Sequence, residues 1–271
     1  VATNSTASWN SNALQGSRRA RAVVYDEKNG YFLIGAKGLS GDKTIPTASI
    51  SDLAQNWPGG NDSGSYSDYS AASVKYGNFS STNMASDGAG NIMVGIKDDD
   101  VILGQLTGDS NTRYNWSTVS GSNFLGTDKD INTIAHGNGV WIVAGENGLM
   151  KRTADASTWE DVSTGTSNNI QSVAYGGAGA STANVWIFVG GSGDVYRSTD
   201  AGVSWSEIDG GNTVKLNAVA SDGSGSWVAV GNSGQFGYSS DDGASWAFAT
   251  ASFTGNWFGI AINRMLPHDA G

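Results

Sequence analysis

The sequence predicts an all-β fold, a β-propeller of about six blades, in one domain that spans residues 1–271. The chain has 39 Gly and only 3 Pro, which is typical of many turns between short strands. A unit that closes on Trp recurs at Trp57, Trp116, Trp159, Trp205 and Trp246. Its period is too short for a βαβ unit with a real helix, but it fits four short strands, which form one blade. An all-β solenoid would need a shorter period.

The first strand of each unit is expected to end on or beside a small residue, as suits an innermost strand where blades converge. The five expected ends are near Val24, Ala85, Ala135, Ala174 and Ala220. A sixth copy, residues 257–264, is expected to end near Ala261.

Each second strand is expected to carry a Gly that is preceded, four residues earlier, by a large or polar residue. These pairs are Tyr31 with Gly35, Asn91 with Gly95, Trp141 with Gly145, Trp186 with Gly190, and Trp227 with Gly231. Runs such as IVAG, IFVG and VAVG predict buried strands, and the Gly and Asn around them predict turns.

The two ends of the chain carry incomplete units that complement each other. Trp9 resembles the end of a unit whose beginning is absent, while residues 257–264 resemble the beginning of a unit without its end. First and fourth strands of a blade run antiparallel, so we expect residues 6–12 and 257–264 to close an incomplete last blade. Five blades are the alternative.

The turns between third and fourth strands share a motif. Residues 198–205 read STDAGVSW, residues 239–246 read SSDDGASW, and a shorter copy at 153–159 reads TADASTW. Asp can accept backbone N–H bonds within such a turn, Gly allows positive φ, and Trp can pack between blades. We expect structural roles for Asp155, Trp159, Ser198, Asp200, Gly202, Trp205, Ser239, Asp241, Gly243 and Trp246.

This motif resembles the Asp-box (BNR-type repeat) of sialidase-like β-propellers, over about residues 20–264. The amino-acid sequence of the repeats is most similar to that of non-enzymatic propellers of phage virion or tail-associated proteins. The resemblance implies a structural or adhesion protein that binds other virion or surface proteins, or a glycan, on a virion or extracellular surface. The alternatives are a sialidase-like glycoside hydrolase and a chaperone like the photosystem II assembly factors.

A sialidase-like active site would need three converging arginines, a Tyr–Glu nucleophile pair and an acid–base Asp. Arg152 and Arg197 occupy the same position of the repeat, which favours a structural role. The cluster of Arg18, Arg19 and Arg21 lacks the Arg-Ile-Pro context of a first catalytic arginine. We therefore expect a binding protein and no catalytic residues.

Charge and composition exclude further classes of function. The net charge of −10 disfavours nucleic acids and anionic lipids. No apolar run approaches the ~20 residues of a membrane helix. With no Cys and only His136 and His268, we expect no metal or cofactor. Acidic groups at Asp98–Asp100, Asp128 with Asp130, and Asp241 with Asp242 lack the spacing of a calcium loop, and solvated turns explain them.

Residues 58–80 form the longest insertion and are the candidate binding surface. They carry Tyr66, Tyr69 and Tyr76 among Ser, Gly and Asn, a composition typical of recognition loops. An excursion between blades, with its tyrosines packed on the rim, is the alternative.

Overall fold

The computed structural model describes residues 19–26, 28, 31–37, 47–49, 83–96, 100–106, 114–119, 124–126, 129–177, 184–252 and 254–262. The chain divides into two compact units, Val1–Ser122 and Asn123–Gly271, and each is described by itself. Within the described ranges the only helical pieces are three 3₁₀ turns, Glu146–Gly148, Gly191–Gly193 and Asn232–Gly234. None of them could cross a membrane.

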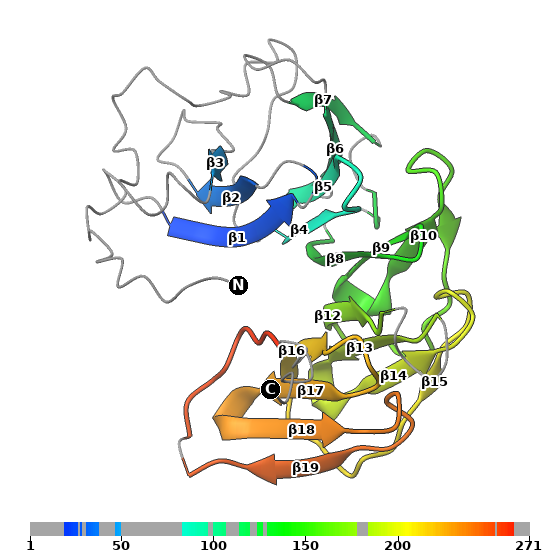
Figure 1. The fold of residues 1–271 in the computed structure, drawn as a ribbon. Coiled ribbons are helices and arrows are strands. Elements are labelled where there is room, and N and C mark those ends of the chain that lie inside the picture. The colour runs from blue at the N-terminus through cyan, green and yellow to red at the C-terminus, as the bar shows by residue number, and fades with distance from the viewer. Residues whose placement is uncertain are drawn as a thin grey trace, which may run out of the picture. The chain divides into compact units, whose positions relative to one another are not determined.

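The first unit contains two antiparallel sheets (Figure 1). The first sheet is β1 (Arg19–Asp26), β2 (Tyr31–Lys37) and β3 (Thr47–Ser49). The second sheet is β4 (Asn83–Ser86), β5 (Asn91–Ile96), β6 (Asp100–Leu106) and β7 (Tyr114–Thr118).

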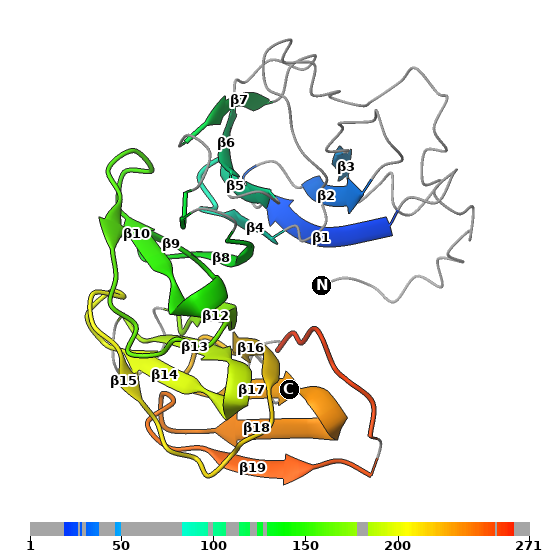
Figure 2. The same cartoon turned by 180° about the vertical axis from the view of Figure 1, so that it is seen from behind.

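The second unit contains three four-stranded antiparallel sheets that follow one another along the chain (Figures 1 and 2). The third sheet is β8 (Ile131–Gly137), β9 (Val140–Gly145), β10 (Met150–Thr153) and β11 (Glu160–Asp161). The fourth is β12 (Ile170–Tyr175), β13 (Trp186–Gly190), β14 (Val195–Ser198) and β15 (Ser206–Glu207). The fifth is β16 (Leu216–Ser221), β17 (Trp227–Gly231), β18 (Gln235–Ser239) and β19 (Ala247–Thr250).

The predicted first and second strands are confirmed in all five sheets. Each first strand ends within two residues of the expected position and pairs antiparallel with the second strand. In the second unit each second strand is buried over its whole length, apart from partial exposure of Val228. This burial explains why these runs are apolar at every position rather than at alternate ones.

The prediction of a sixth first strand is wrong for residues 257–262, the part of it that the structure describes. Residues 257–262 form no strand. The segment nevertheless begins as a first strand does, because Asn217 Nδ2 donates to Trp257 O at 2.9 Å and Asn132 Nδ2 donates to Ile170 O at 3.0 Å. Trp257 thus occupies the position in the repeat that Ile170 has at the start of β12. Among the described residues, however, no second strand lies beside it for pairing. Residues 6–12, the other half of the expected closure, lie outside the described residues.

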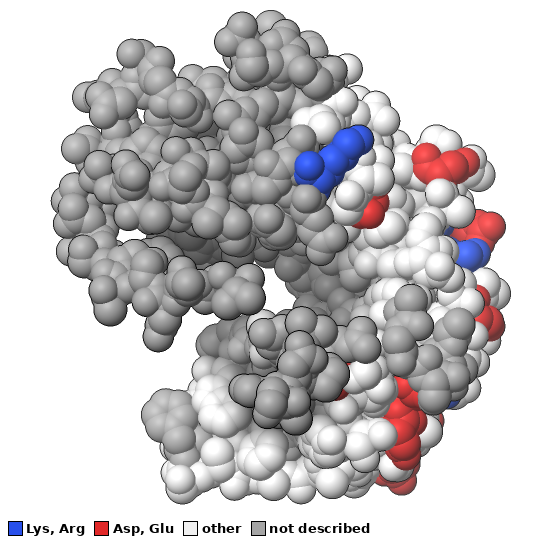
Figure 3. Space-filling model, in the orientation of Figure 1, with Lys and Arg blue, Asp and Glu red and all other residues white. Residues whose placement is uncertain are grey.

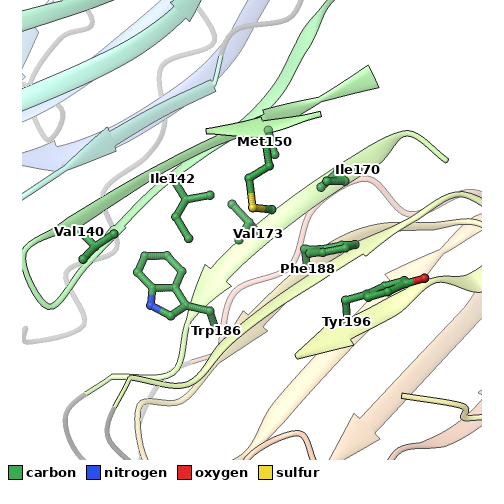
Figure 4. Packing of buried hydrophobic residues seen from close by; sticks show 9 residues of the cluster. Val140, Ile142, Met150, Ile170, Val173, Trp186, Phe188 and Tyr196 are labelled. Carbon is green, nitrogen blue, oxygen red and sulfur yellow. The ribbon is translucent and has the colours of Figure 1, made fainter. Parts of the chain in front are cut away.

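The core of the second unit lies between successive sheets (Figure 4). Trp186 and Phe188 of the fourth sheet are fully buried against Ile142 of the third sheet. Trp227 repeats this arrangement one sheet later, where it is fully buried in a cluster with Ile187 of the fourth sheet. The fourth and fifth sheets are therefore each stabilised by burying apolar side chains against the sheet before them.

Two glycines interlock the sheets. Gly202 has φ +78° and lies so close to the third sheet that a Cβ there would be 2.6 Å from Ile142 Cδ1. Gly243 has φ +74°, and its Cβ would be 2.0 Å from Ile187 Cδ1. The turn after the third strand of one sheet thus packs onto the second strand of the sheet before it.

Candidate functional site

The motif turns are built around an aspartate that collects hydrogen bonds from its own turn. Asp200 Oδ1 accepts the backbone N–H of Val203 at 3.1 Å and of Ser204 at 3.0 Å, and Ser198 Oγ donates to it at 2.7 Å. The Trp205 indole N–H donates to Gly202 O at 3.2 Å. Asp200 therefore accepts two backbone N–H groups within its own turn.

The fifth sheet repeats these contacts. Asp241 Oδ1 accepts the N–H of Ser245 at 3.0 Å and the hydroxyl of Ser239 at 2.7 Å, and Trp246 Nε1 donates to Gly243 O at 3.2 Å. These polar groups satisfy one another, so both turns can form without a ligand.

The shorter turn of the third sheet differs at its Trp. Asp155 Oδ1 still accepts the N–H groups of Ser157 and Thr158, at 2.8 and 2.7 Å. The turn has no Gly at the equivalent of Gly202, and the buried Trp159 Nε1 has no hydrogen-bond partner. The missing residue removes the carbonyl that Trp205 and Trp246 use.

These hydrogen bonds favour the ionised carboxylates. Bonds from the Ser245 hydroxyl and N–H lower the pKa of Asp241 to about 2. Backbone N–H bonds from Thr158 and Ser157 lower the pKa of Asp155. Burial would raise the pKa of Asp200, but hydrogen bonds from Ser204, Ser198 and Val203 outweigh it, and the net shift is downward. The turns are therefore most stable when these groups are charged.

We expect acid to destabilise the second unit over a defined range. A carboxylate whose pKa is depressed on folding stabilises the fold above its unfolded value of ~3.9, and this contribution is lost as the pH falls through the folded value. For Asp241 the range runs from ~4 down to about 2. Thermal unfolding followed by circular dichroism between pH 5 and 2 measures the loss. The Asp241→Asn variant should lose less stability across this range, and an equal loss would contradict this role of the carboxylate.

At the other end of the sheets, the 3₁₀ turns meet the linkers that enter the next sheet. The N–H of Asn147 donates to Asn169 Oδ1 at 3.0 Å, and the N–H of Ser233 donates to Asn256 Oδ1 at 3.0 Å. Asn147 and Ser233 are exposed and have positive φ, as has Ser192 between them in sequence. We call this set of turns and linkers the linker end of the sheets.

The junction between the fourth and fifth sheets breaks this pattern. Lys215 precedes β16 as Asn169 precedes β12, and its backbone O accepts the N–H of Asn232 at 3.0 Å, as Asn169 O accepts that of Gly191. A Lys side chain cannot accept a hydrogen bond, so it cannot cap Ser192 as Asn169 caps Asn147. The junction therefore carries a partly exposed Lys215 and an exposed Ser192, whose N–H has no side-chain cap like those on Asn147 and Ser233 among the described residues. Sequence reasoning missed Lys215, although aligning the residue before each first strand would have found it.

The arginines of the described repeats are held within the sheets. Arg152 forms an ion pair with Glu160, across the pair β10–β11. Arg197 Nε donates to Asp242 O, in the turn of the next sheet, at 2.7 Å. The two side chains occupy equivalent places in different sheets, so they do not form a carboxylate-binding cluster with each other.

The remaining candidate residues give no chemical centre in the described part of the chain. The ring of His136 packs on Trp141, with 4.6 Å between the centroids. The described ranges contain no group of three or more His, Asp or Glu side chains that could hold a metal ion. Other predicted positions lie outside the described residues, namely Tyr66, Tyr69, Tyr76, Arg18, Asp98, Asp99, Asp128 and His268.

Comparison with solved structures decides the fold. YCF48 bound to D1 peptide has a TM-score of 0.54 at 14% identity, over 88% of this chain and 68% of that chain. The WD40 β-propeller domain of Doa1 has a TM-score of 0.57 at 14% identity, over 89% and 72%. The RRP9 WD40 repeats have a TM-score of 0.59 at 13% identity, over 88% and 65%. The fold is a β-propeller.

Each four-stranded sheet is accordingly one propeller blade, and the predicted fold class is confirmed. No model of a protein family matches the chain, and no curated protein matches it either. The described surface is mostly uncharged or acidic on the face shown in Figure 3, where Asp and Glu are spread along the second unit. Lys215 is thus a cation in an acidic propeller, whose net charge is −10.

Proposed function

We propose that this propeller is a non-enzymatic binding protein. The observation that carries the proposal is the way the repeat uses its polar groups. The polar groups of the motif turns bond to one another, as when Asp200 accepts the N–H of Val203 and Asp241 that of Ser245. Arg152 pairs with Glu160, and Arg197 donates to a backbone carbonyl of the next sheet. At the linker end, Lys215 stands where Asn169 and Asn256 each cap a turn, and a Lys side chain cannot make that cap. Residues that break a structural repeat on an exposed turn are candidates for recognition.

The partner we propose is another virion or surface protein, or a glycan, met on a virion or extracellular surface. The amino-acid sequence of the repeats and their resemblance to the Asp-box support this assignment. Among the similar structures, one is a propeller bound to a peptide and others are WD40 propellers. Peptide recognition on a propeller is therefore compatible with this fold. The ammonium group of Lys215 favours a partner that presents a carboxylate at the linker end.

A sialidase-like hydrolase is the second candidate function, and an assay separates the two. The purified chain is incubated with a fluorogenic sialoside, with an active sialidase as the positive control. We expect no release of the fluorophore above the rate without protein, because Arg152 and Arg197 are already engaged. Turnover that scales with the concentration of the chain would replace the binding proposal by an enzymatic one.

The insertion at residues 58–80 supplies the test of binding. We expect the double variant Tyr66→Ala/Tyr69→Ala to weaken attachment of the labelled chain to particles or cells of its source about tenfold or more, since aromatic anchors dominate recognition surfaces. Its melting temperature should stay near that of the unchanged chain. Attachment is measured by co-sedimentation, with Lys215→Ala as a second variant for the linker end. A lower melting temperature with attachment retained would show that the insertion is a structural clasp.

A further inference from the structure

The outer strand of the fifth sheet differs from those of the two sheets before it. β11 and β15 have two residues each and carry acidic side chains, Glu160 with Asp161 and Glu207. β19 has four residues, reads AFAT and carries no charge. The sequence around it contains no Asp, Glu, Lys or Arg from residue 243 to 263. Very short length and charge are what natural proteins use to keep sheet edges from pairing, and β19 is twice as long as β11 and β15 and carries no charge.

The backbone of β19 is placed to accept another strand. β19 ends the strand order β16-β17-β18-β19, so one of its edges is unpaired within the described residues (Figures 1 and 2). Just beyond it, the N–H of Ala251 donates to Gly234 O at 2.9 Å. The backbone N–H and C=O groups of successive residues in an antiparallel strand point to opposite edges. Those of Ala249 and Ala251 therefore point toward β18, and those of Phe248 and Thr250 point to the free edge.

We propose that β19 pairs antiparallel with β19 of a second copy of this chain, about a two-fold axis at Ala249. Phe248 of each copy then lies opposite Thr250 of the other, and both residues present their free N–H and C=O groups. Ala249 faces Ala249 of the second copy in the closely spaced position without hydrogen bonds, where a small side chain is needed. Ala247 faces Ala251 in the same way. The sequence of β19 is therefore self-complementary about its own centre.

Charge selects a second copy as the occupant. In a two-fold contact the residue on the axis meets its own equivalent and its neighbours meet residues of the same strand, so a strand that carries charges of one sign would bring like charges together. Such pairing would bring carboxylates together at β11 and at β15. The chain carries a net charge of −10, and two copies that meet at β19 bring no charged side chains together in the strand pair.

One strand pair buries less than the ~1,200 Å² of standard stable interfaces, so the dimer is reversible. We expect the weight-average mass in sedimentation equilibrium to rise from 27.9 kDa toward twice that value with protein concentration. Raising the salt concentration should increase the dimer fraction, because it screens the repulsion between two acidic chains.

A cysteine cross-link tests the register, because the natural chain has no Cys. In Ala249→Cys the two sulfur-bearing residues face each other at a Cα separation of ~4.5 Å, which suits a disulfide. In the matched control Ala247→Cys the two cysteines are offset by four residues, ~13 Å along the strands. Under mild oxidation we expect Ala249→Cys to form a linked dimer at least tenfold faster than Ala247→Cys. Equal rates would overturn the register.

A charge pair tests the partner. Ala249→Lys and Ala249→Glu should each remain monomeric at the highest concentration, and an equimolar mixture of the two should restore the dimer. Circular dichroism checks that both variants keep the fold. A natural chain that stays monomeric at every concentration and salt would overturn the proposal. So would a dimer that survives Ala249→Lys, because another surface would then hold it, whereas partner binding by the insertion and linker end would be untouched by either result.

Discussion

Replacing Trp186 by Ala is expected to lower the free energy of unfolding of the second unit by about 3 to 5 kcal/mol. Trp186 is fully buried between the third and fourth sheets, where it packs with Ile142 and Tyr175. Its removal leaves a cavity that the surrounding strands can fill only in part, because both sheets are fixed by their own ladders. Urea unfolding followed by circular dichroism measures the change.

Two variants serve as controls. Trp186→Phe should cost less, because it keeps an aromatic ring and removes an indole N–H that is buried without a partner. Trp205→Ala should also cost less than Trp186→Ala, since Trp205 is half-buried rather than fully buried. A loss for Trp205→Ala as large as that for Trp186→Ala would mean that the motif Trp, and not the strand Trp, dominates the contact between sheets.

Gly243→Ala is the second substitution with a large expected effect, a loss of about 2 to 5 kcal/mol. The added methyl group would meet Ile187 Cδ1 at 2.0 Å, at a residue with φ +74°. The cost therefore has two parts, a left-handed backbone occupied by an L-residue and a clash with the sheet before it. Thermal and urea unfolding of the purified variant measure their sum.

Gly223→Ala separates the two parts. Gly223 has φ +77°, and a Cβ there would meet nothing within 4 Å. It should therefore lose only the backbone part, about 1 to 2 kcal/mol. Equal losses in the two variants would show that the turn at Gly243 does not press on Ile187 in solution.

The sequence predicted the positions of the strands well because the repeat marks them twice. Trp186 and Trp227 begin second strands, and Gly190 and Gly231 end them, as expected. Residues 257–264 were expected to form a strand because they resemble a sixth copy of the first strand of the repeat. A strand needs a partner as well as a suitable sequence, and Trp257 has only the bonds that anchor its start. Pairing is a property of the fold that one segment cannot reveal.

Within the candidate site, the sequence predicted only the hydrogen bonds that form inside the motif turns. The bonds of Asp200 and Asp241 follow from the chemistry of their own turns, and the sequence predicted them. Lys215 becomes a candidate only by comparison with Asn169, which occupies the equivalent position one sheet earlier. The hydrogen bond by which Asn169 caps Asn147 is seen in the structure and could not be read from the sequence. The roles of Tyr66, Tyr69 and Tyr76 stay predictions, since these residues lie outside the described part of the chain.

The interlock of Gly202 with Ile142, and of Gly243 with Ile187, has a consequence for how the second unit folds. Within each sheet every strand pairs with its neighbour in sequence, so a sheet closes only short loops. The interlocks then connect the fourth sheet to the third and the fifth sheet to the fourth. We therefore expect folding to spread from one sheet to the next, as in linear repeat proteins, with the middle sheet, which is held on both sides, as the last to exchange its amide hydrogens with solvent.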